Sequence, residues 1–395
     1  MFDRGRSFGD RIWLNSLLIV FCFVSVLLLE SQSAASYPTY ILALLMLVTA
    51  RQWTDVFGLR QTWLVLGLLC YLSASAFWSD PFALRDAVTV ISRALLVFLF
   101  VVALAECEFR GQIRRWLGRA LAAVGLLAVL AAVVHFHVTD PADGRLNGLG
   151  QLDSHVIAAL VFGVVLIFLV DTMMSDDSRP WRLLAAVGIP LVIYAVAMSD
   201  SRNAWISAML GTGVFVLART VKDAQRFLAG VSAFAVVLAA LLAALIAGDD
   251  TRDLILPRGG SFRLTIWEQI ASRLWEGGIW LGLGINTSDN VFAQGMEFLH
   301  PHNLYLSVAY HGGIIGLALF AWLILSSLRI LFANYHSEDA KLALGILALA
   351  LPAYLLDGHE LIDKVGSTWF LFWLPVGVSL GFAWRRRLQV RSRFP

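Results

Sequence analysis

HVIAALVFGVVLIFLVDTM, residues 155–173, is the kind of stretch that decides the fold of this chain. Asp171 is its only Asp, Glu, Lys or Arg, and as a helix it is long enough to cross a bilayer core, which takes about 20 residues. Similar blocks recur throughout the 395 residues, of which 59% are hydrophobic and 15% charged. No water-soluble globular domain needs that much apolar surface. The composition therefore predicts an all-α, polytopic membrane protein.

The apolar blocks predict about 12 transmembrane helices in a single transmembrane domain over residues 1–395. Their approximate limits are 12–29, 37–50, 62–77, 87–105, 117–136, 155–173, 182–198, 203–218, 227–247, 304–328, 342–356 and 367–384.

The charges support this topology. If both termini are cytoplasmic, 21 of the 30 Lys and Arg residues fall on the cytoplasmic side and eight on the outer side. Acidic residues run the other way, with 17 outside and 11 inside. Positive residues concentrate on the cytoplasmic side of membrane proteins, so we predict that both ends lie inside. We expect membrane lipids around the chain and no nucleic-acid partner.

Residues 248–302 form the one long connection, predicted on the outer face, where functional residues are expected. Within it, SFRLTIWEQIASRLWEGG predicts a short amphipathic helix with Ser261 as its N-cap. Arg263 falls in the apolar stripe of this helix, one turn before Trp267. Such a charge is costly unless something pairs with it. Arg263 either snorkels or stacks on Trp267, or it faces an anionic ligand.

FLHPHNLYLSVAYHGG, residues 298–313, places His300 and His302 before a membrane helix that Asn303 is expected to cap. A helix start attracts anions and disfavours a protonated imidazole, which suits a neutral histidine acting as general base beside a phosphate. Zinc binding by the pair lacks a third ligand at a useful spacing, so we expect no metal and no cofactor. Interfacial histidines without a catalytic role remain the alternative.

Six other positions toward the outer face are candidates. Arg202 lies in the short connection AMSDSRNAW, where an interfacial anchor is the alternative. Arg93 lies seven residues beyond Asp86 inside a predicted span, about 10 Å below the surface. An intramembrane Arg indicates a functional site, although an ion pair or snorkelling would also satisfy it. Further outward residues near helix ends are Arg145, His155, Asp357 and His359.

Four short motifs stand out together: Ser201 with Arg202, the R-x-x-x-W of Arg263, the G-x-G of Gly282 and Gly284, and HPHNLYL. With these motifs the chain resembles the O-antigen ligase and polymerase superfamily. It is most similar to bacterial O-antigen ligases. The motifs occupy residues 199–316, and the H-N-x-x-L element of His302, Asn303 and Leu306 is the most telling part.

This resemblance implies a GT-C-like fold in the bacterial inner membrane, with a periplasmic cavity roofed by the loop of residues 248–302. It implies metal-independent, inverting transfer of a glycan from undecaprenyl pyrophosphate to a sugar hydroxyl of lipid A-core. Carried onto this chain, Arg202 and Arg263 bind the pyrophosphate and His302 activates the acceptor hydroxyl. We further expect substrate-binding roles for His300, Asn303, Arg93, Arg145 and Asp357.

Other functions stay open at this point. A Wzy-type polymerase and a protein O-oligosaccharyltransferase share the H-N-x-x-L element and the donor. The 93 residues after His302 favour the ligase over protein-directed members. A transporter of the same lipid-linked glycan belongs to a different class. It would be expected to show internal repeats and ionisable residues at the midplane, and the chain shows neither pattern.

Overall fold

A computed structural model describes residues 6–29, 39–41, 43–45, 53–109, 111, 113–175, 178–232, 263–293, 296–358 and 360–391. The predicted spans 37–50 and 227–247 lie largely outside the described residues, as do residues 248–262 of the long connection, the proposed cap Ser261, and His359.

Nearly all described residues with regular structure are helical. The helices are α1 (Arg6–Leu28), α3 (Trp53–Val56), α4 (Arg60–Ala74), η1 (Ser75–Trp78), α5 (Leu84–Phe109), η2 (Ile113–Gly118), α6 (Arg119–Thr139), α7 (His155–Ser175), α8 (Arg179–Met198), α9 (Arg202–Thr220), α12 (Arg263–Gly277), α13 (Leu304–Ala333), α14 (Glu338–Ala353), η3 (Trp369–Trp373) and α15 (Leu374–Arg391).

Six helical stretches in the described part of the chain are long and apolar enough to cross a membrane. They are Arg60–Trp78, Leu84–Phe109, Trp116–Thr139, His155–Ser175, Arg179–Met198 and Leu304–Ala333. The predicted spans 203–218, 342–356 and 367–384 are also helical, as α9, α14 and η3 with α15, but are not among the six. The chain is thus a multi-pass helical protein, and the number twelve stays a prediction.

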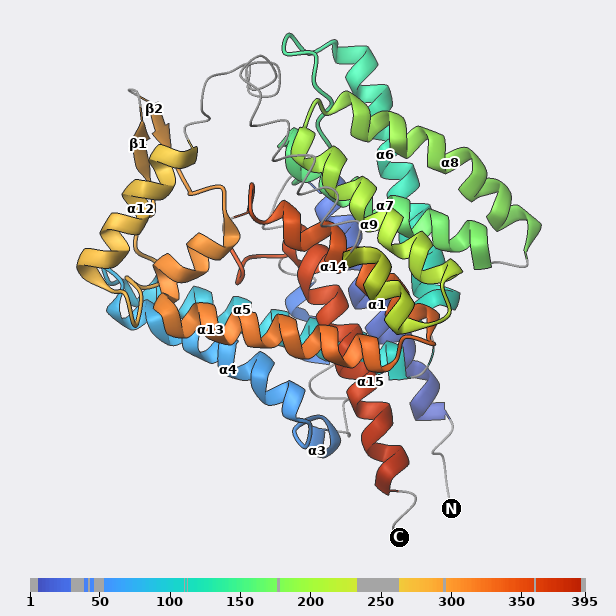
Figure 1. The fold of residues 1–395 in the computed structure, drawn as a ribbon, viewed down its shortest axis with the longest axis horizontal. Helices are drawn as coiled ribbons and strands as arrows, with labels where there is room; N and C mark the ends of the chain where they lie inside the picture. Colours follow the sequence, from blue (N-terminus) through green and yellow to red (C-terminus); the bar gives the residue numbers. More distant parts are fainter. Residues whose placement is uncertain are drawn as a thin grey trace.

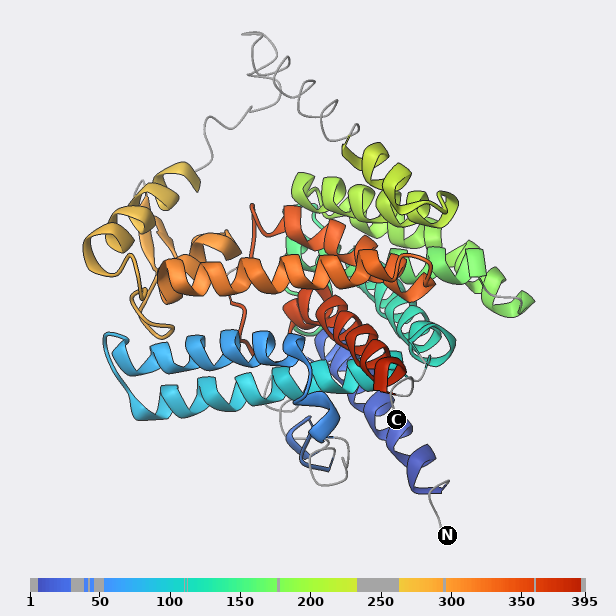
Figure 2. The ribbon, with the colours of Figure 1, turned by 60° about the horizontal axis from the view of Figure 1, so that its bottom comes forward.

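The helices form two groups joined by α14 and α15 (Figures 1 and 2). Helix α13 lies along α4, and α5 packs against α4, α1 and α15, while α7 packs against α6, α8 and α9. Glycines permit the closest approaches. A Cβ on Gly377 of α15 would lie 2.5 Å from the Leu104 side chain of α5, and one on Gly211 of α9 would lie 2.8 Å from the Gly345 carbonyl oxygen of α14. Small residues at such crossings let apolar helices pack closely.

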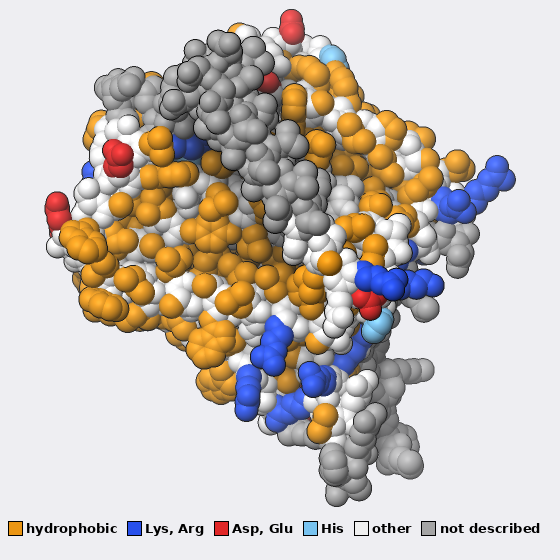
Figure 3. Space-filling view, in the orientation of Figure 1, with side chains coloured by type: hydrophobic (Ala, Val, Ile, Leu, Met, Phe, Trp, Pro, Cys, Tyr) orange, Lys and Arg blue, Asp and Glu red, His pale blue; other side chains and the backbone are white. Residues whose placement is uncertain are grey.

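The surface is divided by charge. In Figure 3, hydrophobic side chains cover most of the visible face, and most of the visible Lys and Arg side chains gather toward the side that holds both termini. On that side the Arg385 guanidinium lies 3.2 Å from the buried Glu108 carboxylate, and Arg219 pairs with Glu338. These contacts join the ends of α5, α9, α14 and α15, which positions the opposite ends of the same helices for the site described below.

Helix α12 carries the predicted amphipathic face. Ile266 and Ile270 are buried against Val291 of the connection and Tyr310 of α13, and Trp267 packs at the edge of this cluster. The long connection also contains strands, which the sequence did not indicate. A short antiparallel hairpin of β1 (Val291–Ala293) and β2 (Met296–Phe298) lies beside α12, with Val291 opposite Phe298. Its three-residue strands are too short to give a periodic sequence pattern.

Helix α13 is broken at Gly313, which has φ 63° and ψ −166°. The G-x-G turn replaces the hydrogen bonds lost there. The Leu283 and Gly284 amides donate to the Tyr310 and His311 carbonyls at 2.8 and 3.1 Å. The Ile314 amide donates in turn to the Ile279 carbonyl at 2.9 Å. Since a break inside a membrane helix leaves polar backbone groups that need partners, the turn and the broken helix form one structural unit.

Candidate functional site

Three connecting segments meet at the ends of the helices opposite the termini. The Leu304 amide at the start of α13 donates to the Tyr354 carbonyl just after α14, at 2.9 Å. The Asn203 side-chain amide in the first turn of α9 donates to the Ala353 carbonyl at 3.2 Å. The starts of α9 and α13 therefore share the end of α14, and the residues preceding both helices come together there.

His302 and Asp357 form the centre of this assembly. His302 Nδ1 lies 3.4 Å from Asp357 Oδ1, and the exposed fractions of the two side chains are 35% and 9%. Burial opposes ionisation of Asp357, but contacts from His302 and the Gly358 amide outweigh it and lower the pKa of Asp357 below its ordinary value. A carboxylate in this position fixes the orientation and tautomer of the ring and leaves Nε2 to exchange a proton.

The backbone holds His302 in an uncommon conformation. It has φ 49°, and the only other non-glycine residues with positive φ in the described part of the chain are Asp140 and Asp200. Asp200 lies just before the N-cap residue of α9, and His302 lies just before the N-cap residue of α13. The next residues cap those helices, with the Ser201 hydroxyl accepting from the Ala204 amide at 3.3 Å and Asn303 Oδ1 accepting from the Leu306 amide at 3.0 Å. The cap expected at Asn303 is confirmed, and strained backbone of this kind clusters at functional sites.

Helix α12 is attached directly to the histidine segment. Trp267 Nε1 donates to the Pro301 carbonyl at 2.9 Å, between His300 and His302, whose rings lie 4.0 Å apart between centroids. Arg263 starts α12 one turn before Trp267 and is partly buried. The predicted stripe is thus present, and Arg263 is carried on the helix that contacts the histidines. Arg273, on the same helix, donates to the Asn290 carbonyl at 2.8 Å.

Arg202 is the first residue of α9 and its side chain is exposed. Its neighbour in sequence is Asn203, which contacts the end of α14 four residues before Asp357. Arg145 lies on the same face, where its guanidinium is 3.4 Å from Asp200 Oδ2 and its side chain lines an open cavity of about 490 Å³. His155 is the first residue of α7. The start of α9 therefore contacts the end of α14, α12 contacts the histidine segment, and His302 of that segment contacts Asp357, with Arg145 beside Asp200.

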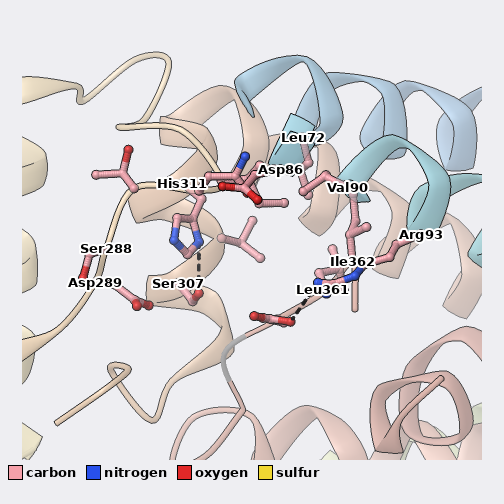
Figure 4. Close-up of a pocket in the computed structure, with 15 residues that line it drawn as sticks. Leu72, Asp86, Val90, Arg93, Ser288, Asp289, Ser307, His311, Leu361 and Ile362 are labelled. Atoms are coloured by element: carbon pink, nitrogen blue, oxygen red, sulfur yellow. Dashed lines mark hydrogen bonds and ion pairs between the residues drawn. The ribbon is translucent and has the colours of Figure 1, made fainter. Parts of the chain in front are cut away.

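Arg93 belongs to a neighbouring cavity instead. Its guanidinium lies 3.8 Å from Asp363 and 4.0 Å from Glu360, so the ion pair considered from the sequence is present. Arg93 lines a cavity of about 300 Å³ together with Asp86, Asp289, Glu360 and His311 (Figure 4). The sequence did not single out the last three. Their segments are far apart in the chain, and only the Asp86 to Arg93 spacing on one face of α5 gave a signal.

The same part of the chain is similar to known proteins. Residues 185–321, which span α9, α12 and the HPHN segment, match the sequence model of the O-antigen ligase family. A protein of Pseudomonas aeruginosa named O-antigen ligase is 28% identical over 83% of this chain and 79% of its own length. A Rickettsia conorii protein, provisionally named a polysaccharide ligase, is 23% identical over 82% of each chain. The chain therefore carries an O-antigen ligase domain, which confirms the family predicted from its sequence.

Proposed function

We propose that this protein is a glycan ligase that moves a polysaccharide from undecaprenyl pyrophosphate to a sugar hydroxyl of lipid A-core. The observation that carries the proposal is the contact of His302 with Asp357 at the start of α13, beside the helices that bear Arg202 and Arg263. The names of the relatives support a ligase acting on polysaccharide, while the geometry supports the assignment of roles to residues.

In the proposed reaction His302 Nε2 takes the proton of the acceptor hydroxyl, and Asp357 stabilises the resulting imidazolium. The acceptor oxygen then attacks the anomeric carbon of the donor glycan from the side opposite the pyrophosphate. The new glycosidic bond forms as the bond to the pyrophosphate oxygen breaks, so the anomeric configuration inverts. Undecaprenyl pyrophosphate leaves with the bonding electron pair and needs no proton at that step.

Arg202 and Arg263 are proposed to bind the pyrophosphate. A guanidinium offers two parallel hydrogen bonds to phosphate oxygens and stays charged in partly dry surroundings. Its interaction strengthens as negative charge develops on the leaving group, which lowers the barrier. The amides at the start of α9 add to this field. His300 and Asn303 are proposed to line the same site, and Arg145 to position substrate through Asp200.

The site is proposed to face the periplasm of the inner membrane, with both termini cytoplasmic and the connection of residues 248–302 as its roof. The attachment of α12 to Pro301 supports a covering role. No nucleotide is available on that side, so a pre-activated, lipid-linked donor suits it. A fold of the GT-C type is proposed on the same grounds.

The test is ligation by purified protein supplied with undecaprenyl-pyrophosphate glycan and lipid A-core. We expect His302→Ala to abolish transfer and His336→Ala to leave it intact, because His336 is an exposed histidine in the turn between α13 and α14. Free glycan repeat and a peptide serve as competing acceptors. Transfer by His302→Ala at the wild-type rate would rule out the proposed mechanism, and preferred extension of free repeat would indicate a polymerase.

A further inference from the structure

The cavity next to the His302–Asp357 pair is built from five segments. Figure 4 shows Leu72 of α4, Asp86, Val90 and Arg93 of α5, Ser288 and Asp289 of the connection, Ser307 and His311 of α13, and Leu361 and Ile362 around a common space. Its volume of about 300 Å³ is at the lower end of the range of small-molecule sites. It is therefore large enough for a sugar ring but too small for a long glycan.

The cavity adjoins the proposed catalytic pair along two segments. Glu360 follows Asp357 by three residues in the segment between α14 and η3. Ser307 lies one helical turn after Asn303, whose carbonyl accepts from the Ser307 amide at 2.9 Å. Arg202 is on α9, whose Asn203 side chain contacts the end of α14, and Arg202 does not line the cavity. A group in this cavity is thus bound by other residues than Arg202.

The wall combines hydrogen-bonding groups with aliphatic patches. Asp86, Asp289 and Glu360 supply carboxyl groups, and Ser307 is hydrogen-bonded to His311 Nδ1 at 3.3 Å. Removal from water and the neighbouring Asp363 raise the pKa of Glu360 to about 8, and burial raises that of Asp289 to about 6. The Glu360 carboxyl, which keeps its proton near neutral pH, donates as well as accepts. Such a wall suits hydroxyl groups better than phosphates.

One wall atom also lacks a partner. Asn286 Nδ2 is buried and has no hydrogen-bond acceptor among the described residues. The backbone amide of Asn286, by contrast, donates to the Ser79 hydroxyl at 3.0 Å. A buried donor without an acceptor is costly. Nδ2 is shielded from the cavity, so a bound molecule supplies its acceptor once the Asn286 side chain turns toward that molecule.

We propose that this cavity is the acceptor subsite and binds an uncharged, hydroxyl-rich sugar unit next to His302. This inference rests on the proposed function, because it assigns the acceptor in that reaction to the cavity. Asn286 donates to a ring substituent, the carboxyl groups bind hydroxyls, and aliphatic residues such as Val90 and Ile362 pack against the ring. Arg93, the cation of this wall, is paired with Glu360 and Asp363, so the carboxyl-rich wall disfavours the anionic donor and keeps the two substrates apart.

Direct binding tests the subsite without turnover. Full-length His302→Ala protein in detergent is titrated with methyl glucoside, methyl galactoside and methyl glucuronide, with saturation-transfer NMR as the readout. We expect the neutral hexosides to bind and the glucuronide to bind at least about tenfold more weakly. Adding Asn286→Ala or Glu360→Gln should weaken hexoside binding about tenfold, as expected for one lost hydrogen bond to a buried partner. Glu276→Gln, an exposed carboxylate on α12, is the control and should change nothing.

Equal binding of the glucuronide, or unchanged hexoside binding in both cavity variants, would overturn the proposal. Kinetics in the otherwise wild-type protein provide a second readout, in which the same variants should raise the acceptor KM about tenfold and leave the donor KM unchanged. A raised donor KM with an unchanged acceptor KM would place the donor there and also refute the subsite. Hexoside binding that depends on Asn286, combined with no ligation by the wild-type protein, would uphold the subsite and refute the proposed function.

Discussion

The His302 side chain depends on Asp357 for its proposed role, and this dependence predicts a specific kinetic defect. Asp357→Asn keeps the size of the side chain but lets an amide face Nδ1, so the ring is no longer fixed as a base. In a Ser-His-Asp triad, the Asp→Asn change that leaves the histidine in the wrong tautomer lowers kcat about 10⁴-fold. We expect kcat to fall by about that factor with little change in either KM. Steady-state ligation measures it, with exposed Glu268→Gln as the control, and an unchanged kcat would contradict the role of Asp357.

We expect that Lys cannot replace Arg202 or Arg263 in binding the pyrophosphate. Arg202→Lys and Arg263→Lys keep the charge but lose the planar fork that binds two phosphate oxygens. We expect each to lower kcat/KM for the lipid-linked donor about tenfold or more, the cost of one charge-assisted hydrogen bond. Arg329→Lys, an exposed position on α13 far along the chain from the helix start, is the matched control. Equal losses in all three variants would indicate a general effect of the substitution.

At the residue scale, sequence patterns identified local features of single helices but not the contacts between residues that are distant in the chain. Asn303 as a cap and Arg263 on an apolar stripe follow from spacing within one helix, and the structure shows both. The contact of His302 with Asp357 joins positions 55 residues apart, and the cavity joins α4, α5 and the segment after α14. Such proximity is set by how helices pack, which periodicity in one segment does not encode. Asp357 was therefore ranked with several outward residues although it contacts the proposed base.

The turn that completes broken helix α13 makes a prediction at the scale of elements. Gly282 has φ 76°, and a Cβ there would lie 2.4 Å from the His311 carbonyl. Gly282→Ala should therefore lower the free energy of unfolding by about 1–3 kcal/mol and disturb the adjoining connection. Gly213→Ala in α9 meets no atom within 4 Å and should be neutral or stabilising by up to about 1 kcal/mol. Thermal unfolding in detergent compares the two, and equal midpoints would show that the turn is not structurally required.

The segment between α14 and η3, through Glu360, should make the stability of the protein depend on pH. Glu360 faces the cavity, with 40% of its side chain exposed, and its pKa is raised to about 8 by partial removal from water and by Asp363, against the opposing charge of Arg93. A raised folded-state pKa gives stability that is complete below the ordinary value and is lost as pH rises through the folded value. We expect the temperature of the unfolding midpoint to decrease as the pH is raised from about 6 to about 9, across the Glu360 pKa of about 8.

Glu360→Gln separates this effect from other titrations. The amide cannot ionise, so the variant should show a flatter pH dependence over the same interval, with a midpoint at pH 9 no lower than that of the wild type. Glu276→Gln, an exposed carboxylate, should keep the wild-type slope. An identical slope in all three proteins would assign the pH dependence to other groups.

At the scale of the molecule, the charge distribution and the alternation of helices argue for one orientation. The sequence was sufficient for the helical, multi-pass class, because long apolar blocks decide it locally. The described helices alternate so that the starts of α9 and α13 and the end of α14 share one face, while Arg219, Glu338 and Arg385 share the other. If positive residues mark the cytoplasm, His302 is outside.

Cysteine labelling tests this orientation directly. Cys22, Cys70 and Cys107 are first replaced by Ala or Ser, and a single cysteine is then introduced at Glu276 on α12 or at His336 beyond α13, both of which are exposed. In cells with a permeabilised outer membrane, a membrane-impermeant maleimide should label the position 276 variant. It should label the position 336 variant only after lysis. The reverse pattern would place His302 in the cytoplasm, where nucleotide-activated sugars are available, and the argument for a lipid-linked donor would fail with it.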